Sequence, residues 1–430
     1  MGHGHSHGHG HDHSASWSSW FETGRLRLVL VALVAVLVAA IVGLVVSWPT
    51  GEGQRVAIER ADAIGLSTER VNATVITSEN APCSFANEDF PEECRLLTLN
   101  ILEGPDAGSQ LALPEIILSI ERGLPEFDPG DEVILGFVPL TNTYFYDDVD
   151  RTGALATLGV IFAVIVIAFG RLRGLLALVS MAVTVAVFVA YIAPSALDGN
   201  DPVLVALIGA TVIAFVSFYL THGFSPTTTV ALAGTLAALA LTFVLSWLFF
   251  GLARFTGFAS GEALVIPVLN EDLNLSSLIL GGAIIGALGA LDDVTVTQVA
   301  TVSEIRRVDK ALPSTALIRS GLSIGRDHIA ATVNTLLLAY AGASLPLILL
   351  FAASDQSLVS VANSEVIAVE IVRTLCGSIG LIAAVPLTTV LAAAILPPTG
   401  SRPNEHGVHA ESEEADSLPE PTWADFAPEE

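Results

Sequence analysis

The chain has 430 residues, of which 52% are hydrophobic and only 14% charged, and its 44 acidic and 18 basic residues give a formal net charge of -26. This hydrophobic share excludes an ordinary soluble domain, and the negative charge excludes nucleic acid as a partner. The composition predicts an α-helical polytopic membrane protein with about eight transmembrane helices, whose first partner is the lipid bilayer.

The first 24 residues form a histidine-rich tail in which glycine, serine or aspartate separates one histidine from the next. Neutral imidazoles bind Zn, Ni or Cu, and such a segment needs no fixed geometry to do so. An expression tag is the alternative, although a tag is usually an unbroken run of histidines. We expect a native cytoplasmic tail that binds a divalent metal such as Zn, the one cofactor that the sequence suggests. The six histidines are His3, His5, His7, His9, His11 and His13.

Eight apolar runs are long enough, at about 18 residues, to cross the hydrocarbon core of a bilayer. They cover 28–48, 153–169, 175–192, 203–221, 228–250, 278–297, 329–352 and 371–396. A cleaved signal peptide is the alternative for the first run, which lies in a segment at 25–48. We interpret that segment as an uncleaved signal anchor, because about 20 apolar residues exceed the usual h-region and no small-x-small cleavage site follows.

The connections between these runs differ in charge, and short loops rich in arginine and lysine stay in the cytoplasm. Alternate connections are basic, and those on the opposite side are acidic. This pattern places both termini in the cytoplasm. The basic residues are Arg25, Arg27, Arg171, Arg173, Arg306, Arg307, Lys310, Arg319 and Arg326, and the acidic residues opposite are Asp198, Asp201, Glu262, Glu271, Asp272 and Asp355.

Residues 49–150 separate the first two runs and are numerous enough for one small domain. Its segments 71–77, 96–101 and 133–138 are rich in β-branched residues and are bounded by Gly, Pro and Asp turns. We predict a small β-rich barrel or sandwich outside the cytoplasm. Its excess of acidic residues favours cations over anionic lipid head groups.

Two of the three cysteines, Cys83 and Cys94, lie in this predicted β domain. An oxidising exterior favours a disulfide between them, and two free thiols are the alternative. The third, Cys376, lies within the last apolar run, where a cysteine usually serves as a small packing residue.

Two adjacent carboxylates, Asp292 and Asp293, interrupt the glycine-rich run at 278–300. Charged side chains at membrane depth cost a few kcal/mol each on insertion scales, and they are usually retained where they face a bundle interior or an ion path. The pair is therefore the first candidate for a functional site. Hydrogen bonding to a neighbouring helix, or anchoring at the interface, is the competing explanation.

Helical periodicity separates the two aspartates by about 100°. Asp293 continues a stripe of small residues above it and polar residues below it. Glycines at this spacing allow a neighbouring backbone to approach closely, so local geometry favours Asp293 as the functional carboxylate. Asp292 lies on a more apolar face. The stripe contains Gly282, Gly286, Gly289, Asp293, Thr297, Ala300 and Glu304.

The neighbouring runs supply candidate partners for the carboxylates. His328 and Asn334 stand at the start of the seventh run. Hydrogen bonding to another helix is the alternative for Asn334, and capping of the membrane interface is the alternative for His328. Residues 221–229 contain a Gly, a Pro and four threonines, which indicates a short turn or a locally unwound helix start. Such backbone often lines a ligand cavity, although an ordinary loop has the same composition.

Three segments resemble signature blocks of the YibE/F family of bacterial membrane proteins. They are Gly286–Asp292 (GALGALD), Ser323–His328 (SIGRDH) and Asn334–Pro346 (NTLLLAYAGASLP), in the family's order and at similar separations. Thr295 and Glu304 also fit the family pattern. The family often has one aspartate where this chain has Asp292 and Asp293, so either can be the equivalent carboxylate.

This resemblance covers residues of about 55 to 397. It implies a multipass protein of the bacterial cytoplasmic membrane with an extracytoplasmic β domain, and it implies no defined biochemical role. The predicted division is a His-rich cytoplasmic tail at 1–24, a transmembrane signal anchor at 25–48, the β-rich domain at 49–150, a seven-helix transmembrane domain at 151–397 and an acidic disordered cytoplasmic tail at 398–430.

Ion-coupled transport is the function that these features favour. A secondary transporter that exports a divalent metal cation or a small solute explains the buried carboxylates, the acidic domain and the histidine tail together. The site is expected on the sixth and seventh spans. Its candidate residues are Asp292, Asp293, Thr295, Thr297, Glu304, His328 and Asn334.

Two other classes of function compete with transport. A non-catalytic envelope scaffold or sensor would use the β domain to bind an envelope protein, or the chain would form a homo-oligomer. An intramembrane aspartyl protease needs a second aspartate in another span, and none is apparent, so we expect no enzyme. No phosphate-binding G-x-x-x-x-G-K-[ST] loop is present either, which leaves an ion gradient or a partner to drive transport.

Overall fold

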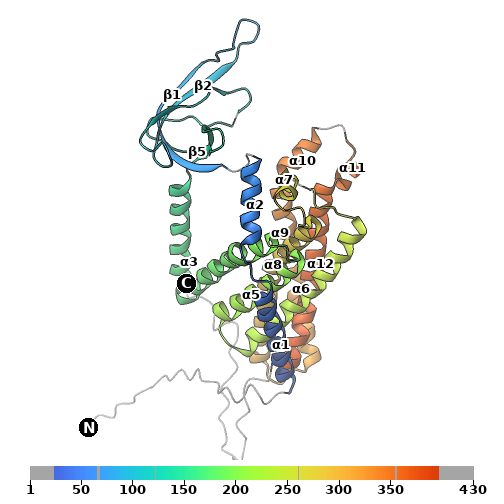
Figure 1. Cartoon of the computed structure of the whole chain (residues 1–430). Coiled ribbons are helices and arrows are strands. Elements are labelled where there is room, and N and C mark those ends of the chain that lie inside the picture. Colours follow the sequence, from blue (N-terminus) through green and yellow to red (C-terminus); the bar gives the residue numbers. More distant parts are fainter. Residues whose placement is uncertain (1–23, 65–67, 122, 260, 354–355, 397–430) are drawn as a thin grey trace, which may run out of the picture.

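A computed structural model describes residues 24–64, 68–121, 123–259, 261–353 and 356–396 of the chain. The six histidines of the predicted N-terminal tail and the whole predicted C-terminal tail lie outside these residues. The described part consists of a helical bundle and a small β sheet, which lies beyond one end of the bundle (Figure 1). We call this end the sheet end.

The opposite end of the bundle is where α1 (Gly24–Val46) begins and α12 (Glu365–Ile395) ends. Arg25 Nη1 donates to the Ala394 carbonyl at 3.4 Å, which ties the two helices together there. Most of the basic residues that the sequence assigned to the cytoplasm lie on helix ends and turns of this side, and Arg319 and Arg326 lie further along a helix that begins here at Ser314. We therefore call it the basic end.

The β domain is one antiparallel sheet with strand order β3-β2-β1-β5-β6, and β4 also pairs with β2. The expected barrel or sandwich is therefore wrong for the described residues, because the sheet is single and stays open. The long strand β1 pairs with β5 along residues 69–74 and with β2 along residues 73–82, and a register shift between Val75 and Thr77 interrupts the pairing with β2. The strands are β1 (Glu69–Pro82), β2 (Glu93–Ile101), β3 (Gln110–Ala112), β4 (Ile116–Ile117), β5 (Glu132–Val138) and β6 (Thr143–Val149).

Alternate residues of the central strands form the core of this sheet, as the β-branched patterning predicts. Ala73, Leu99, Val133 and Leu135 are all fully buried there. Cys83 and Cys94 form a disulfide that closes the loop between β1 and β2. Cys376 is a free, buried cysteine of α12.

Helix α2 (Glu52–Ala63) precedes the sheet, although the sequence assigned these residues to the β domain. Arg55 pairs with Glu52 and Glu59 at helical spacing, which stabilises a solvent-exposed helix. The helix was not predicted because its sequence has no apolar stripe. The joint between α1 and α2 is fixed by Asp198, which accepts hydrogen bonds from Thr50, Gly51 and Gly53.

Helix α3 (Thr152–Val187) is broken at Arg171, where φ is 52°. The backbone folds back so closely that a Cβ on Gly174 would collide with the carbonyl of Val166. This break falls between the second and third predicted spans. The break divides α3 into two arms, one before and one after Arg171. The second arm continues through a π-helical turn, η2 (Phe188–Ile192), into α4 (Ala193–Leu197).

The remaining helices complete the bundle. Six helices of the described part are long and apolar enough to cross a membrane, or seven if α9 and α10, bent by 64° at their junction, form one span. The chain is therefore a polytopic membrane protein. The helices are α5 (Pro202–His222), α6 (Pro226–Ala253), α7 (Gly261–Leu269), α8 (Leu275–Val308), α9 (Ser314–Ala343), α10 (Leu345–Ala352), α11 (Leu358–Asn363) and α12.

Helix ends extend beyond the apolar runs at the basic end. Helix α9 begins at Ser314, 15 residues before the predicted span, and α8 continues to Val308. The expected long basic connection is thus mostly helical, because hydropathy detects only the part of a helix that lies in hydrocarbon.

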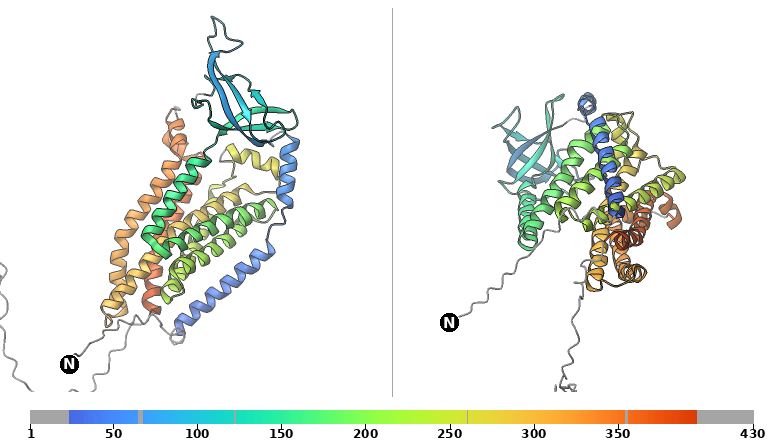
Figure 2. Two further views of the ribbon diagram at one scale, coloured as in Figure 1. Left: turned by 90° about the vertical axis from the view of Figure 1, so that its left-hand side faces the viewer. Right: turned by 90° about the horizontal axis from the view of Figure 1, so that it is seen from below.

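The closest packing is between α6 and α12, at the centre of the bundle. A Cβ on Gly234 would lie 2.6 Å from Thr388 Oγ1, and Gly380 has no room for a Cβ beside Thr242. Helix α1 lies along the outside of the bundle, with little of its surface covered (Figure 2). The core therefore consists of α5, α6, α8 and α12.

Candidate functional site

Asp292 lies at the midpoint of the 34-residue helix α8, which continues beyond the apolar run at the basic end. Its side chain is partly buried and points towards α5, where the Ser217 hydroxyl donates to Oδ2 at 3.4 Å. Asp293 is exposed on a different face of the helix, and its carboxylate makes no hydrogen bond or ion pair with a described residue. The two aspartates therefore occupy different environments.

The glycine stripe that contains Asp293 faces outward. Gly282 and Gly289 have nothing within 4 Å of an added Cβ, and Gly286 meets only the hydroxyl of Tyr340. No neighbouring backbone packs on this stripe within the described chain, so the expected close contact is wrong. The small residues that do pack closely in α9 are Gly321 and Gly325, which face α8 and α12.

A buried polar network follows Asp292 along the inner face of α8. Thr295, which the sequence proposed for the site, shares a 2.5 Å hydrogen bond with Thr235 of α6 and donates to the Asp292 carbonyl. Gln298 donates to the Gly321 carbonyl of α9 at 2.9 Å and to Thr389 Oγ1 of α12 at 2.7 Å. These bonds hold α6, α8, α9 and α12 in one arrangement around the carboxylate.

A cavity of about 340 Å³ opens at the basic end of the bundle, beside the same face of α8. Val296, one helical turn after Asp292, lies in its wall, and His222 is five residues from Ser217 on α5. Asp292 thus stands about one turn beyond the cavity. Its lining is Arg173, His222, Thr227, Thr228, Ala231, Val296, Val299, Ala300, Ser303 and Glu304.

The turn between α5 and α6 forms part of this lining, as the sequence suggested for residues 221–229. Gly223 adopts a φ of 75°, which favours glycine, and Ser225 caps α6 by accepting from the Thr228 amide at 3.1 Å. Two threonines of the first turn of α6 then face the cavity. The segment is a short turn rather than an unwound helix.

The other residues proposed from sequence are more scattered. Glu304 lies at the cavity and pairs with Arg307 at 2.5 Å, whereas the exposed Thr297 hydroxyl donates to the Asp293 carbonyl of its own helix. His328 and Asn334 lie on α9 and make no hydrogen bond with either aspartate. His328 Nε2 is buried without a hydrogen-bond partner among the described residues.

A second charged cluster lies near the sheet end, and sequence reasoning missed it. Arg373 of α12 pairs with Glu370 at 2.9 Å, and its guanidinium lies 5.9 Å from the ring centre of Tyr340. Both charged side chains line a cavity of about 450 Å³ between α7, α8, α12 and the junction of α9 and α10. Opposite charges three residues apart at the edge of an apolar run were the available signal.

The donors around Asp292 determine which cation it can hold. A divalent metal needs several carboxylate, imidazole or thiolate ligands, and no group of three such side chains occurs within the described ranges. One carboxylate beside a hydroxyl can instead bind and release a proton. The histidine tail, which the sequence proposed as a metal site, lies outside those ranges.

The helical part of the chain matches a known protein family. The profile of the YibE/F-like protein family matches residues 158–398, more than half of the chain, and the match begins within α3. It excludes α1, α2 and the sheet, although the resemblance in the sequence was expected to begin near residue 55. No curated protein and no solved structure matches. The chain belongs to the family of YibE/F-like proteins.

Proposed function

We propose that this protein is a secondary transporter in which Asp292 takes up and releases the coupling ion. The observation that carries this proposal is the position of Asp292 at the midpoint of α8, partly buried, about one turn from a polar cavity that opens at the basic end. Partly buried carboxylates in membrane helices usually mark ion or proton paths.

A transport path also needs access from the other side of the membrane, and the second cavity is the candidate for it. It lies at the sheet end, and the Glu370–Arg373 pair faces it. Between the two cavities the inner face of α8 is packed and hydrogen-bonded. Alternating access requires such a barrier around a central site. The buried α8 residues between the levels of the two cavities, among them Ile284, Leu288 and Leu291, support this role, and the Thr295–Thr235 hydrogen bond closes the end of the barrier next to the basic-end cavity.

The transported solute is proposed to be a small solute or a cation, coupled to protons. A single carboxylate favours a proton at Asp292, so a divalent metal requires further ligands, from the solute path or the histidine tail. If each arm of α3 crosses the membrane, the chain has eight crossings. Both termini are then cytoplasmic, and the β domain lies outside the cytoplasm.

The test compares two adjacent substitutions in proteoliposomes. Asp292→Asn is expected to reduce proton flux, driven by an imposed gradient of a candidate solute or metal, to the level of empty liposomes. Asp293→Asn is expected to leave the flux unchanged, because that side chain is exposed and unpaired. An internal pH-sensitive dye measures the flux, and the thermal midpoint in detergent shows whether each variant is folded.

Three outcomes contradict the proposal or its assignment. Equal loss in both variants means that charge rather than position matters. Loss of flux only in Asp293→Asn would show that Asp293 is the functional carboxylate, as the helical periodicity of the sequence predicts. Absence of flux in the wild type for every tested cation and solute favours the envelope scaffold or sensor, in which the helices only anchor the sheet.

A further inference from the structure

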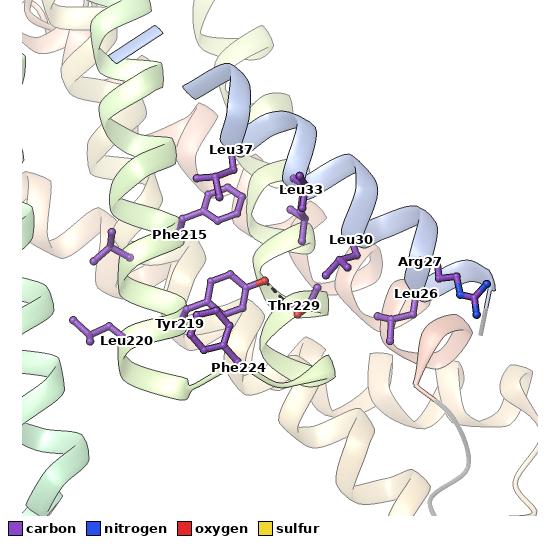
Figure 3. Close-up of a pocket in the computed structure, with 12 residues that line it drawn as sticks. Leu26, Arg27, Leu30, Leu33, Leu37, Phe215, Tyr219, Leu220, Phe224 and Thr229 are labelled. Atoms are coloured by element: carbon purple, nitrogen blue, oxygen red, sulfur yellow. Dashed lines mark hydrogen bonds between the residues drawn. The ribbon is translucent and has the colours of Figure 1, made fainter. Parts of the chain in front are cut away.

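Helix α1 touches the bundle along a narrow line and leaves a groove beside it. Its three buried residues, Leu26, Leu33 and Ala40, are spaced seven apart. The groove lies between α1, α5 and the start of α6, and its side chains are shown in Figure 3. Its lining includes Leu26, Arg27, Leu30 and Leu37 of α1, Tyr219 of α5 and Thr229 of α6.

The dimensions of the groove suit a hydrocarbon chain. Its volume is about 570 Å³, and its lining on α1 runs from Leu26 to Leu37, about 16 Å at 1.5 Å per residue. That length is close to one leaflet of the hydrocarbon core, about 15 Å.

The one charged side chain of the lining, Arg27, lies at one end of the groove. Its walls are aliphatic and aromatic, and the two hydroxyls among them, on Tyr219 and Thr229, are 3.3 Å apart and hydrogen-bond to each other. Arg27 is exposed at the basic end of the groove, where it makes no hydrogen bond or ion pair with a described residue. Arg25, two residues away, is already bound to the Ala394 carbonyl.

We propose that the groove binds one acyl chain of an anionic phospholipid from the leaflet at the basic end, and that Arg27 binds its phosphate. Apolar walls along one leaflet and a free guanidinium at head-group height match the two parts of such a lipid. The lipid would fill the space beside α1 and hold this helix against α5 and α6. This proposal is independent of the transported ion.

The test measures lipid retention by the full-length protein in native mass spectrometry. The protein is released from detergent after incubation with phosphatidylglycerol or phosphatidylcholine of the same chain length. The wild type is expected to retain one phosphatidylglycerol about fivefold more than phosphatidylcholine, and Arg27→Gln is expected to lose that preference. Leu30→Trp, which fills the groove, is expected to retain neither lipid.

Arg319→Gln is the matched control, because Arg319 is also an exposed arginine at the basic end but lies on α9, away from the groove. It is expected to retain the lipid as the wild type does. Equal retention of both lipids by the wild type overturns the proposal. So does an equal loss in Arg27→Gln and Arg319→Gln, which indicates general surface charge, or unchanged retention in Leu30→Trp.

Discussion

The two faces of helix α8 have similar small and polar residues but opposite environments. On the inner face, Gly281 packs against α5, and Thr295 and Gln298 are buried with hydrogen-bond partners on three other helices. On the outer face, Gly282 and Asp293 are exposed and have no partner among the described residues. The inner face packs against other helices, and the outer face contacts no other part of the described chain at these residues.

The difference shows that a small or polar stripe does not by itself identify the buried side of a membrane helix. What decides is whether neighbouring helices present complementary groups at the same height. Ala206 meets Gly281, Thr235 meets Thr295, and the Gly321 carbonyl meets Gln298. Because adjacent residues differ by about 100°, Asp292 and Asp293 fall on different sides of this division.

Two adjacent glycines of α8 provide the strongest test of this comparison. Gly281→Leu is expected to lower the free energy of unfolding by about 3 kcal/mol, because a Cβ there would lie 2.9 Å from that of Ala206 and 3.1 Å from the Pro202 carbonyl. Gly282→Leu is expected to be neutral or stabilising by up to about 1 kcal/mol, since its surroundings are open and leucine favours helix. Thermal midpoints in detergent measure both.

Equal destabilisation by the two leucines would break the comparison. It would mean that something covers the outer face in the native protein, such as a second copy of the chain. A mass measurement of the detergent-solubilised protein would then show whether the Gly282 variant has lost an oligomer that the wild type forms.

A smaller effect is expected from the polar network. Gln298→Leu removes the donor to the buried Gly321 carbonyl and should destabilise the protein by about 2 kcal/mol. Thr301→Val is the control on the outer part of the same helix, where the hydroxyl donates only to the Thr297 carbonyl, and its effect should stay within about 0.5 kcal/mol. Equal midpoints for the two variants would show that Gln298 contributes no net stability.

The sequence predicted the helices well where hydrophobicity alone determines them. Each predicted run lies mostly within a helix of the structure, and Arg171 divides α3 where a connection was expected. Polar helices were missed, because α2 and the first four turns of α9 have no continuous apolar run. The strands were predicted from their β-branched residues, but that pattern does not determine whether strands form one open sheet, a sandwich or a closed barrel.

The candidate site was predicted in part. The aspartate pair and the cavity-lining turn after α5 were found from charge and from glycine and proline, because both are anomalies in apolar sequence. The preferred aspartate was Asp293, whereas the burial supports Asp292, since periodicity defines faces but not their neighbours. Gln298 was overlooked as one amide in a polar stretch, and its role depends on Gly321 and Thr389 far away in the sequence.

Asp198 is a hydrogen-bonded carboxylate outside the membrane helices, and its substitution is expected to change stability least among these predictions. Burial alone would raise the pKa of Asp198, but hydrogen bonds from Thr50, Gly53 and Gly51 outweigh it and hold the pKa below its ordinary value. A lowered pKa stabilises the folded state above the unfolded value of about 3.9, and this contribution is lost as the pH falls through the folded pKa.

Asp198→Asn is therefore expected to cost about 1 kcal/mol at pH 7 and to differ less from the wild type as the pH falls below about 4. Thermal midpoints of both proteins between pH 3 and pH 7 measure this difference. A gap that stays constant down to pH 3 would show that the Asp198 hydrogen bonds to the joint between α1 and α2 do not depend on its charge. The joint would then be held by the buried bonds of Ser47 to Tyr191 and Ser195.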